Sequence, residues 1–117
     1  MSSSLTSPSF WILTVLAGQR RHGYEILHET TRASGGRVSL KATTLYSALE
    51  RLEREGLIAA DGDEIVSGRA RRYYVLTDDG SAALVAEVDA LEVQTRAART
   101  RLVASGHVFA FTVAVPA

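Results

Sequence analysis

The chain of 117 residues has no cysteine and only two prolines. Without cysteine it can form no disulfide bond, thiolate metal site or cysteine nucleophile, which fits a reducing cytoplasm. Long hydrophobic runs are missing too, because the apolar run from Phe10 to Ala17 is far shorter than the roughly 20 residues that span a bilayer as a helix. No basic residue precedes that run, as a secretory signal would require. We therefore expect a cytoplasmic protein without a membrane partner.

The chain also lacks net charge, because 13 Lys and Arg residues balance 13 Asp and Glu residues. A total of zero weakens any inference of nucleic-acid binding from composition alone. The charge is unevenly distributed, however. Between Ile65 and Leu76 the charged residues are Arg69, Arg71 and Arg72, with no acidic residue among them. A locally basic segment of this kind is suited to contact phosphate groups.

The apolar pattern predicts three helices in the first half of one compact domain. Residues 10–17 are apolar on nearly every side, which is typical of a buried helix. A second helix is expected to begin at His22 and Gly23 and to end before Ser34, and a third to begin near Lys41. The third helix has one apolar stripe, formed by Leu45, Ala48, Leu49 and Leu52.

A β-hairpin with a long loop is expected after the third helix. Strand signals cover residues 57–60 and 73–76, and residues 61–63 and 67–68 between them are typical of turns. Thr77 can cap a final helix, since Asp78 and Asp79 would then lie in its first turn and complement the helix dipole. The sequence therefore predicts a mainly α fold with a small β-hairpin and a long last helix.

The last helix carries a pattern that is typical of a dimer seam. Its residues recur at alternating spacings of four and three, and all but one are apolar, as in a coiled coil. A seam needs a partner surface, so we expect a homodimer; the alternative is that this helix packs back on its own domain. The seam consists of Leu84, Val88, Leu91, Thr95, Ala98 and Leu102.

Three helices, a basic hairpin and a long helix, in this order, predict a winged helix-turn-helix protein that binds DNA. The third helix would enter the major groove, where its first turns contact the bases. Backbone amides at the start of the second helix can hold a phosphate, and the hairpin arginines can reach phosphates or the minor groove. The candidate DNA-binding residues are Gly23, Tyr24, Lys41, Thr43, Thr44, Tyr46, Ser47, Arg69, Arg71 and Arg72.

The two tyrosines among these candidates also have a purely structural interpretation. Tyr46 could pack against Leu49 and Glu50, but its phenol lies on the polar side of the third helix, where it can donate a hydrogen bond to a phosphate. We prefer that role for Tyr46. Tyr24 could instead wedge against the first helix.

The arginines have a structural interpretation as well. Those of the hairpin could form a solvated edge, but the lack of acidic residues in their segment favours contact with phosphates or the minor groove. Arg51 and Arg54 are expected to pair with Glu50, Glu55 or other neighbours on the third helix. We therefore do not count these two arginines among the base-reading residues.

Three segments resemble the PadR family of bacterial transcriptional regulators. They are HGYEI at 22–26, TLYSALERLEREGLI at 44–58 and GRARRYYVLTDDG at 68–80, and the resemblance extends from about Phe10 to Leu102. The chain departs from the family pattern at Ala42 and Thr43, where relatives often have a Pro-Gly pair. It also departs in its short C-terminal region, which ends in an apolar tail.

The resemblance implies a dimer joined by its C-terminal helices, which represses transcription by binding an operator. Two-fold symmetry makes that operator an inverted repeat of double-stranded DNA. In many relatives a small aromatic or hydrophobic inducer releases the operator and lies between the first and last helices. The corresponding candidate ligand-binding residues are Trp11, Val15, Val88 and Leu91.

These observations divide the chain into a flexible N-terminus (1–8), a DNA-binding domain (9–77), a dimerisation helix (78–104) and an apolar tail of unknown role (105–117). His22, Glu25 and His28 recur every three residues and could in principle hold a metal, but no fourth ligand is visible. We expect no metal, no cofactor and no catalytic residue, since no phosphate loop or nucleophile motif is present. The alternative function is a winged-helix module that docks on protein instead of DNA.

Overall fold

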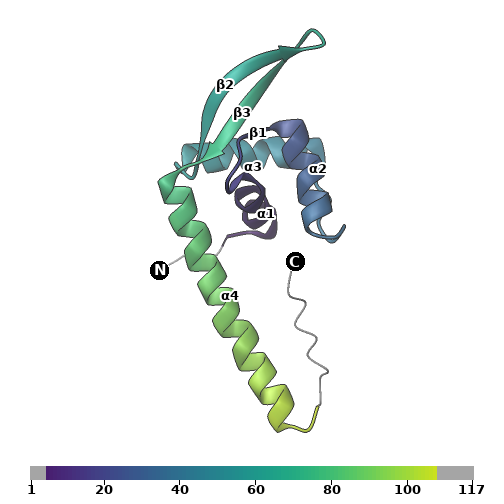
Figure 1. The fold of residues 1–117 in the computed structure, drawn as a ribbon, viewed down its shortest axis with the longest axis vertical. Coiled ribbons are helices and arrows are strands. Elements are labelled where there is room, and N and C mark those ends of the chain that lie inside the picture. Colours follow the sequence, from purple (N-terminus) through teal and green to yellow (C-terminus); the bar gives the residue numbers. More distant parts are fainter. Residues whose placement is uncertain (1–4, 108–117) are drawn as a thin grey trace. The chain divides into compact units, whose positions relative to one another are not determined.

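The computed structural model describes residues 5–107, which form four helices and three strands (Figure 1). This confirms the predicted mainly α fold with a small β-sheet and a long last helix. Along the chain the elements are α1 (Ser7–Leu16), β1 (Arg21–His22), α2 (Gly23–Ala33), α3 (Ala42–Arg54), β2 (Ile58–Val66), β3 (Arg69–Leu76) and α4 (Asp78–Ala104). One compact unit, here the N-terminal unit, extends to Glu87, and a second begins at Val88.

The core of the N-terminal unit lies among α1, α2, α3 and the base of the hairpin. Helix α1 contributes Ile12, Leu13 and Leu16, each no more than 2% exposed, as expected for a helix with almost no polar face. The apolar stripe predicted for α3 is buried in full. Its members are Leu45, Ala48, Leu49 and Leu52. Because that stripe is anchored in the core, the opposite face of α3 has a fixed orientation.

Side-chain caps fix the starts of α1 and α2. Thr6 caps α1, its hydroxyl accepting from the Ser9 amide at 3.3 Å, so the helix begins at Ser7 rather than after the predicted boundary at residue 8. His22 caps α2 with a reciprocal pair of hydrogen bonds. Its Nδ1 accepts from the Glu25 amide at 3.3 Å, and Glu25 Oε1 accepts from the His22 amide at 3.1 Å.

The three strands form an antiparallel sheet in the order β1-β3-β2. The prediction of a long hairpin loop is wrong, because β2 and β3 are joined only by Ser67 and Gly68, both at positive φ (52° and 76°), which suits a tight hairpin turn. Residues 61–63 form no turn. The register shifts between Ala60 and Asp63, and Gly62 at φ 90° accommodates the extra residue as a β-bulge without ending the strand.

Helix α4 begins where Thr77 accepts a hydrogen bond from the Gly80 amide at 3.0 Å, as the sequence predicted. Gly80 is buried so closely against the Leu57 carbonyl that a Cβ would overlap it. Every residue from Val88 to His107 is exposed. Within residues 5–107 no helix is long and apolar enough to cross a membrane. Most of the predicted apolar tail, from residue 108 onward, lies outside the described residues.

Candidate nucleic-acid interface

The first turns of α3 present the side chains that the sequence singled out for base contact. Lys41 is the N-cap residue, and the four candidates that follow lie on the helix itself. All five side chains are exposed, and Tyr46 is exposed by 55% although it is aromatic. No acidic residue lies in the first turn of α3, so nothing there repels a phosphate. The five residues are Lys41, Thr43, Thr44, Tyr46 and Ser47.

Tyr46 also touches the second helix, a contact that the sequence did not predict. A Cβ built on Gly23 would lie 2.8 Å from the Tyr46 hydroxyl oxygen, so the ring rests over the bare backbone at the start of α2. Gly23 is buried, whereas Tyr24 beside it is 59% exposed. The Tyr46 phenol therefore lies next to the first amides of α2, of which that of Glu25 already donates to His22 Nδ1. Together these groups offer several hydrogen-bond donors to an anion.

The three hairpin arginines differ in how far they are already engaged. Among the described residues Arg69 makes no side-chain hydrogen bond or ion pair. The Arg71 guanidinium lies 3.1 Å from His22 Nε2 and 5.8 Å from the centroid of the Tyr24 ring. Arg72 donates to Glu53 Oε2 at 3.4 Å. Arg69 is thus the most available cation, and Arg72 is partly neutralised.

The hairpin is less basic in space than its sequence segment suggested. Strand β2 is acidic, and its register sets Asp63 opposite Arg72 and Glu64 opposite Arg71. Neither cross-strand pair comes within ion-pair distance among the described residues, because the two arginines reach His22 and Glu53 instead. The absence of acidic neighbours along the chain therefore does not hold across the sheet.

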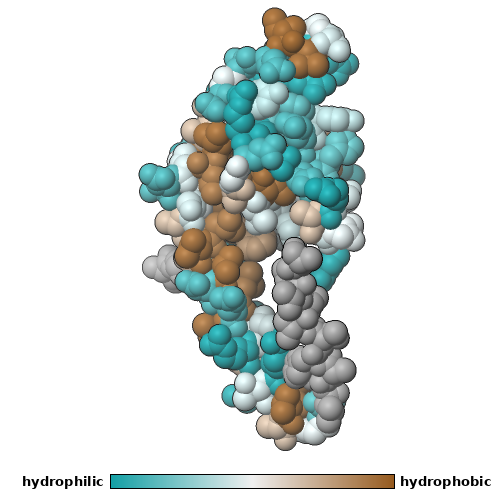
Figure 2. Space-filling model, in the orientation of Figure 1, coloured by the Kyte–Doolittle hydropathy of each residue, from teal (hydrophilic) through white to brown (hydrophobic). Residues whose placement is uncertain are grey.

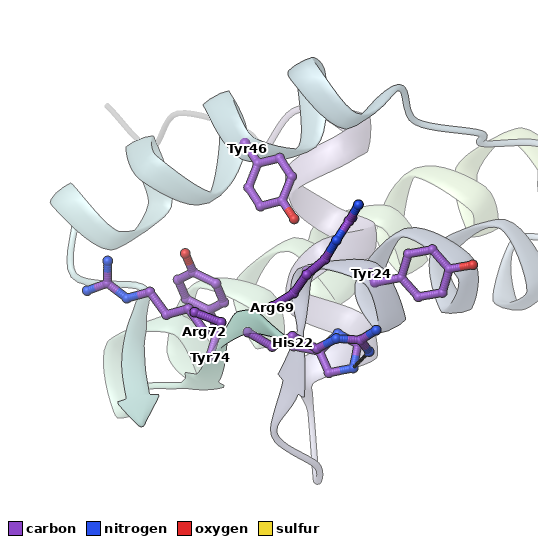
Figure 3. Close-up of a pocket in the computed structure, with 9 residues that line it drawn as sticks. His22, Tyr24, Tyr46, Arg69, Arg72 and Tyr74 are labelled. Atoms are coloured by element: carbon purple, nitrogen blue, oxygen red, sulfur yellow. Dashed lines mark hydrogen bonds between the residues drawn. The ribbon is translucent and has the colours of Figure 1, made fainter. Parts of the chain in front are cut away.

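A pocket of about 480 Å³ opens between α3, the start of α2 and the hairpin (Figure 3). Figure 3 shows Tyr46 above, His22 and Tyr24 at the start of α2, and Arg69 directed toward the space between the two tyrosine rings. Burial raises the pKa of Tyr74, which is only 8% exposed in the wall of the pocket. The lining residues are His22, Gly23, Tyr24, Tyr46, Arg69, Ala70, Arg71, Arg72 and Tyr74.

Arg20 is a residue that the sequence analysis missed. Its guanidinium lies 3.9 Å from the centroid of the Tyr73 ring, donates to the Asp61 carbonyl at 2.6 Å and lies 3.8 Å from the Asp61 carboxylate. One side chain thereby ties β3 to the bulge of β2. Since Arg20 and Asp61 are 41 positions apart, no local pattern could have revealed the contact.

Arg51 and Arg54, predicted to pair on their own helix, behave differently from each other. Arg54 lies 3.9 Å from Glu50, one turn away, as predicted. The prediction for Arg51 is wrong, because its Nη2 donates to Ser9 Oγ at 2.7 Å. Ser9 belongs to α1 and is only 2% exposed, so this bond links α3 to the first turn of α1.

The histidines and glutamates at the start of α2 and along it contact their own helix, and Glu29 also lies 3.8 Å from Arg21 of β1. His22 and Glu25 form its capping box, and the His28 ring packs edge-on against Tyr24 at 4.4 Å. Glu29 accepts two hydrogen bonds from Arg32, which lower the pKa of that carboxyl. Within residues 5–107 no group of three or more His, Asp or Glu side chains is placed to hold a metal ion.

The candidate ligand-binding residues occupy different environments. Trp11 on α1 is half-buried, and Val15 lies in the core at 7% exposed. Val88 and Leu91, on the part of α4 that belongs to the second unit, are each 38% exposed. The four residues therefore come from both units.

The predicted seam divides in the same way. Leu84 packs against the core of the N-terminal unit, so packing within its own unit accounts for its position. The remaining seam positions are exposed. They are Val88, Leu91, Thr95, Ala98 and Leu102.

A three-helix cluster that presents one helix beside a hairpin defines the winged helix-turn-helix class. The chain belongs to the PadR-like family of transcriptional regulators, since the model of that family matches residues 12–86. The resemblance drawn from the three sequence segments is thereby confirmed.

Among curated proteins, the transcriptional regulator Rv3488 of Mycobacterium tuberculosis is 42% identical over 85 residues, covering 73% of this chain and 76% of its own. A PadR family regulator from Clostridium difficile has a TM-score of 0.70 at 28% identity, over 83% of this chain and 99% of that one. PadR of Bacillus subtilis, solved in complex with operator DNA, has a TM-score of 0.63 at 26% identity, over 70% of this chain and 46% of its own.

Proposed function

We propose that this regulator binds operator DNA by inserting the first turns of α3 into the major groove. One observation carries the proposal: the five candidates at the start of α3 are exposed while the opposite stripe of the same helix is buried in the core. A helix fits the width of the major groove, and a helix seated in this way holds its polar face at a fixed angle to the bases. Operator binding by the structurally similar Bacillus subtilis PadR supports it.

Phosphates flank this helix in the proposed complex. Tyr46 Oη and the first amides of α2 form one donor cluster, which is suited to a single phosphate of the DNA backbone. Arg69 and Arg71 approach the same pocket from β3 and supply positive charge. Arg72 contributes less, because Glu53 already offsets its charge.

The proposed active form is a homodimer joined through the exposed part of the seam. Val88, Leu91 and Leu102 are apolar and 38–39% exposed on a helix that continues beyond the N-terminal unit. Apolar residues repeating at this spacing bury themselves by pairing with a second helix. A two-fold dimer would place two copies of α3 about 34 Å apart, one turn of DNA, and would select an inverted repeat.

We further propose that the regulator is a repressor and that a small aromatic or hydrophobic inducer releases it. Membership of the PadR-like family supports this, together with a half-buried Trp11 that could stack on an aromatic ring. Trp11 is the sole tryptophan, so its fluorescence reports on its own surroundings. Titration with phenolic compounds should change that emission and weaken DNA binding together. A compound that releases DNA without altering Trp11 emission would place the inducer elsewhere.

A mobility-shift titration against the DNA flanking the protein's own gene tests the central proposal. Binding should weaken steeply as salt rises, because bound cations are recaptured by the phosphates. Tyr46→Phe should weaken binding about fivefold to tenfold through one lost phosphate bond. Arg71→Ala should weaken it as well, and Arg69→Ala should lower the salt slope by about one, more than Arg72→Ala does. A module that docks on protein would give no shift.

Leu91→Glu tests the dimer separately. A charge at the seam should give a monomer in analytical ultracentrifugation and, since the two half-sites are then bound independently, should weaken operator binding. The N-terminal unit of this variant should keep its thermal transition. Wild-type affinity in all of the Tyr46, Arg71 and Leu91 variants would contradict the proposed mode of binding.

A further inference from the structure

Ile65, near the end of the hairpin, is the most exposed large hydrophobic side chain of the described residues, at 78%. Figure 2 shows a hydrophobic spot at the far end of the hairpin, set among polar surface. Most isoleucines are buried, and this one packs against no core residue. Its position calls for an explanation outside the folding of the chain.

The register of the hairpin shows which way Ile65 faces. Ile65 pairs with Ala70, and paired residues on antiparallel strands share one face of the sheet. Side chains alternate along β3, so Arg72 lies on that same face. Arg72 reaches Glu53 of α3, which identifies the face as the one turned toward that helix. Ile65 therefore lies on the face of the hairpin that is turned toward α3.

Two features shape the hairpin, a bulge in β2 and a short turn. The bulge at Gly62 bends β2, and Arg20 holds the bulge by its bonds to Asp61 and its stacking on Tyr73. A turn of only two residues then closes the end. The bulge and the two-residue turn thus define the course of β2 and β3 on either side of Ile65.

DNA geometry selects the groove that Ile65 would meet. When a helix fills a major groove, the adjacent groove is the minor groove, about 6 Å wide, which a side chain at the tip of a hairpin can enter. Arg69, the first residue of β3 and opposite Val66, has no ion pair among the described residues and is available to hold a flanking phosphate. The tip thus combines an apolar side chain with a cation, as do proteins that bind the minor groove.

We propose that Ile65 is a specificity-determining residue, which favours A·T over G·C base pairs where the hairpin enters the minor groove. Guanine projects its 2-amino group into this groove, whereas A·T pairs do not. An isoleucine that covers the amino group removes its water and offers no acceptor, which is costly. Over an A·T pair the side chain covers only the N3 and O2 acceptors, and a G·C pair adds the uncompensated amino donor to groups of this kind. The inference rests on the proposed DNA binding and adds a second reading element to α3.

The test starts from a duplex that the full-length wild-type protein enriches from a random pool. The enriched motif should contain two blocks, an inner one set by α3 and an outer A·T block set by the hairpin. Replacing the outer A·T pairs with G·C should weaken wild-type binding about tenfold. Replacing them with inosine·C should restore it, because inosine lacks the 2-amino group but keeps the major-groove edge of guanine.

Ile65→Ser is the decisive variant, with Ile65→Val as the conservative one. Ile65→Ser should bind the A·T duplex about tenfold more weakly than wild type, keep the salt slope and bind all three duplexes alike. Ile65→Val should keep the preference. Val85→Ser, at an exposed site on α4, is the matched control and should bind like wild type.

The outcomes separate the two proposals. If the wild-type protein enriches no duplex, DNA binding itself fails and the role of Ile65 fails with it. If it enriches a motif but Ile65→Ser enriches the same motif with equal affinity, only the inference about Ile65 is overturned. If inosine·C behaves like G·C, the preference is not read in the minor groove, and the inference is overturned as well.

Discussion

The N-terminal unit and the part of α4 beyond it follow opposite rules. The N-terminal unit buries apolar residues from three helices and two strands, and it caps its helices with Thr6, His22 and Thr77. From Val88 to Ala104 the helix is exposed on every side and buries nothing. The first region is therefore stabilised by its own hydrophobic core. The second is stabilised within the chain only by local helix propensity, and its apolar side chains are left exposed.

The contrast matters for the proposed function because the first region would contact DNA and the second would pair two copies of the chain. Reading DNA needs side chains held at fixed angles, and the buried stripe of α3 supplies that rigidity. Pairing two copies needs an exposed apolar surface, which a core cannot offer. Mutations in the first region should therefore change the free energy of unfolding, and mutations in the second should change the dependence on protein concentration.

Gly80→Ala should have the largest effect. A Cβ at this position would overlap the Leu57 carbonyl, which is backbone and cannot rotate away. We expect a loss of about 4 kcal/mol in the free energy of unfolding, measured in urea. Ser81→Ala, the exposed neighbour, is the control and should lose less than about 0.5 kcal/mol. A Gly80→Ala protein as stable as the wild type would show that the start of α4 does not pack closely against the Leu57 carbonyl.

Leu49→Ala and Leu102→Ala compare the two regions directly. Leu49 is 1% exposed and Leu102 is 39% exposed, so the same truncation should cost about 3 kcal/mol at the first and under about 0.5 kcal/mol at the second in the N-terminal transition. Only the Leu102 effect should vary with protein concentration, as sedimentation would detect. Equal losses of unfolding free energy at both sites would contradict the claim that only the N-terminal unit is stabilised by a core.

Thr77→Ala sharpens the comparison at the start of α4, which belongs to the N-terminal unit. The Thr77 hydroxyl accepts from the Gly80 amide at 3.0 Å and donates to the Gly56 carbonyl at 2.6 Å. Removing this cap should cost about 1 kcal/mol in thermal unfolding. Thr77→Ser keeps the hydroxyl and should recover most of it. A Ser variant as weak as the Ala variant would assign the loss to the methyl group instead.

The smallest effect expected is an alkaline one. Burial raises the pKa of Tyr74 in the folded chain. The unfolded tyrosine ionises near about pH 10 while the folded one keeps its proton, so the unfolded state then binds fewer protons. The free energy of unfolding should therefore be full below that pH and fall as pH rises through it. Tyr74→Phe should reduce this slope in urea titrations above pH 10, with the exposed Tyr24→Phe as matched control; an unchanged slope would assign it to other groups.

Much of the N-terminal unit was predictable because its patterns are local. The stripe of α3 repeats every three or four residues, and the start of α4 follows from Thr77 with two aspartates behind it. The hairpin loop was misread because Gly62 is a turn residue by type and a bulge residue in fact, and only pairing with β3 distinguishes the two. Strand β1 was missed because its two residues carry no pattern at all.

The candidate interface was only partly predictable. Exposure of Lys41, Thr43, Thr44, Tyr46 and Ser47 followed from their place opposite the leucines. What each cation contacts did not, since Arg51 finds Ser9 on α1 and Arg20 finds the bulge of β2. Each arginine and its partner are far apart in sequence. A side chain with several rotatable bonds can reach several partners, and the one that it contacts depends on how the helices pack.

By itself the sequence determined which faces are apolar, where α2, α3 and α4 start and which polar residues stand on the outer side of α3, because each depends on spacing over a few positions. The tertiary structure decided that Gly23 receives the Tyr46 ring, that Arg69 pairs with no described residue while Arg72 donates to Glu53, and that Ile65 is exposed near the end of the hairpin. Those facts depend on distances between segments, which no local pattern encodes.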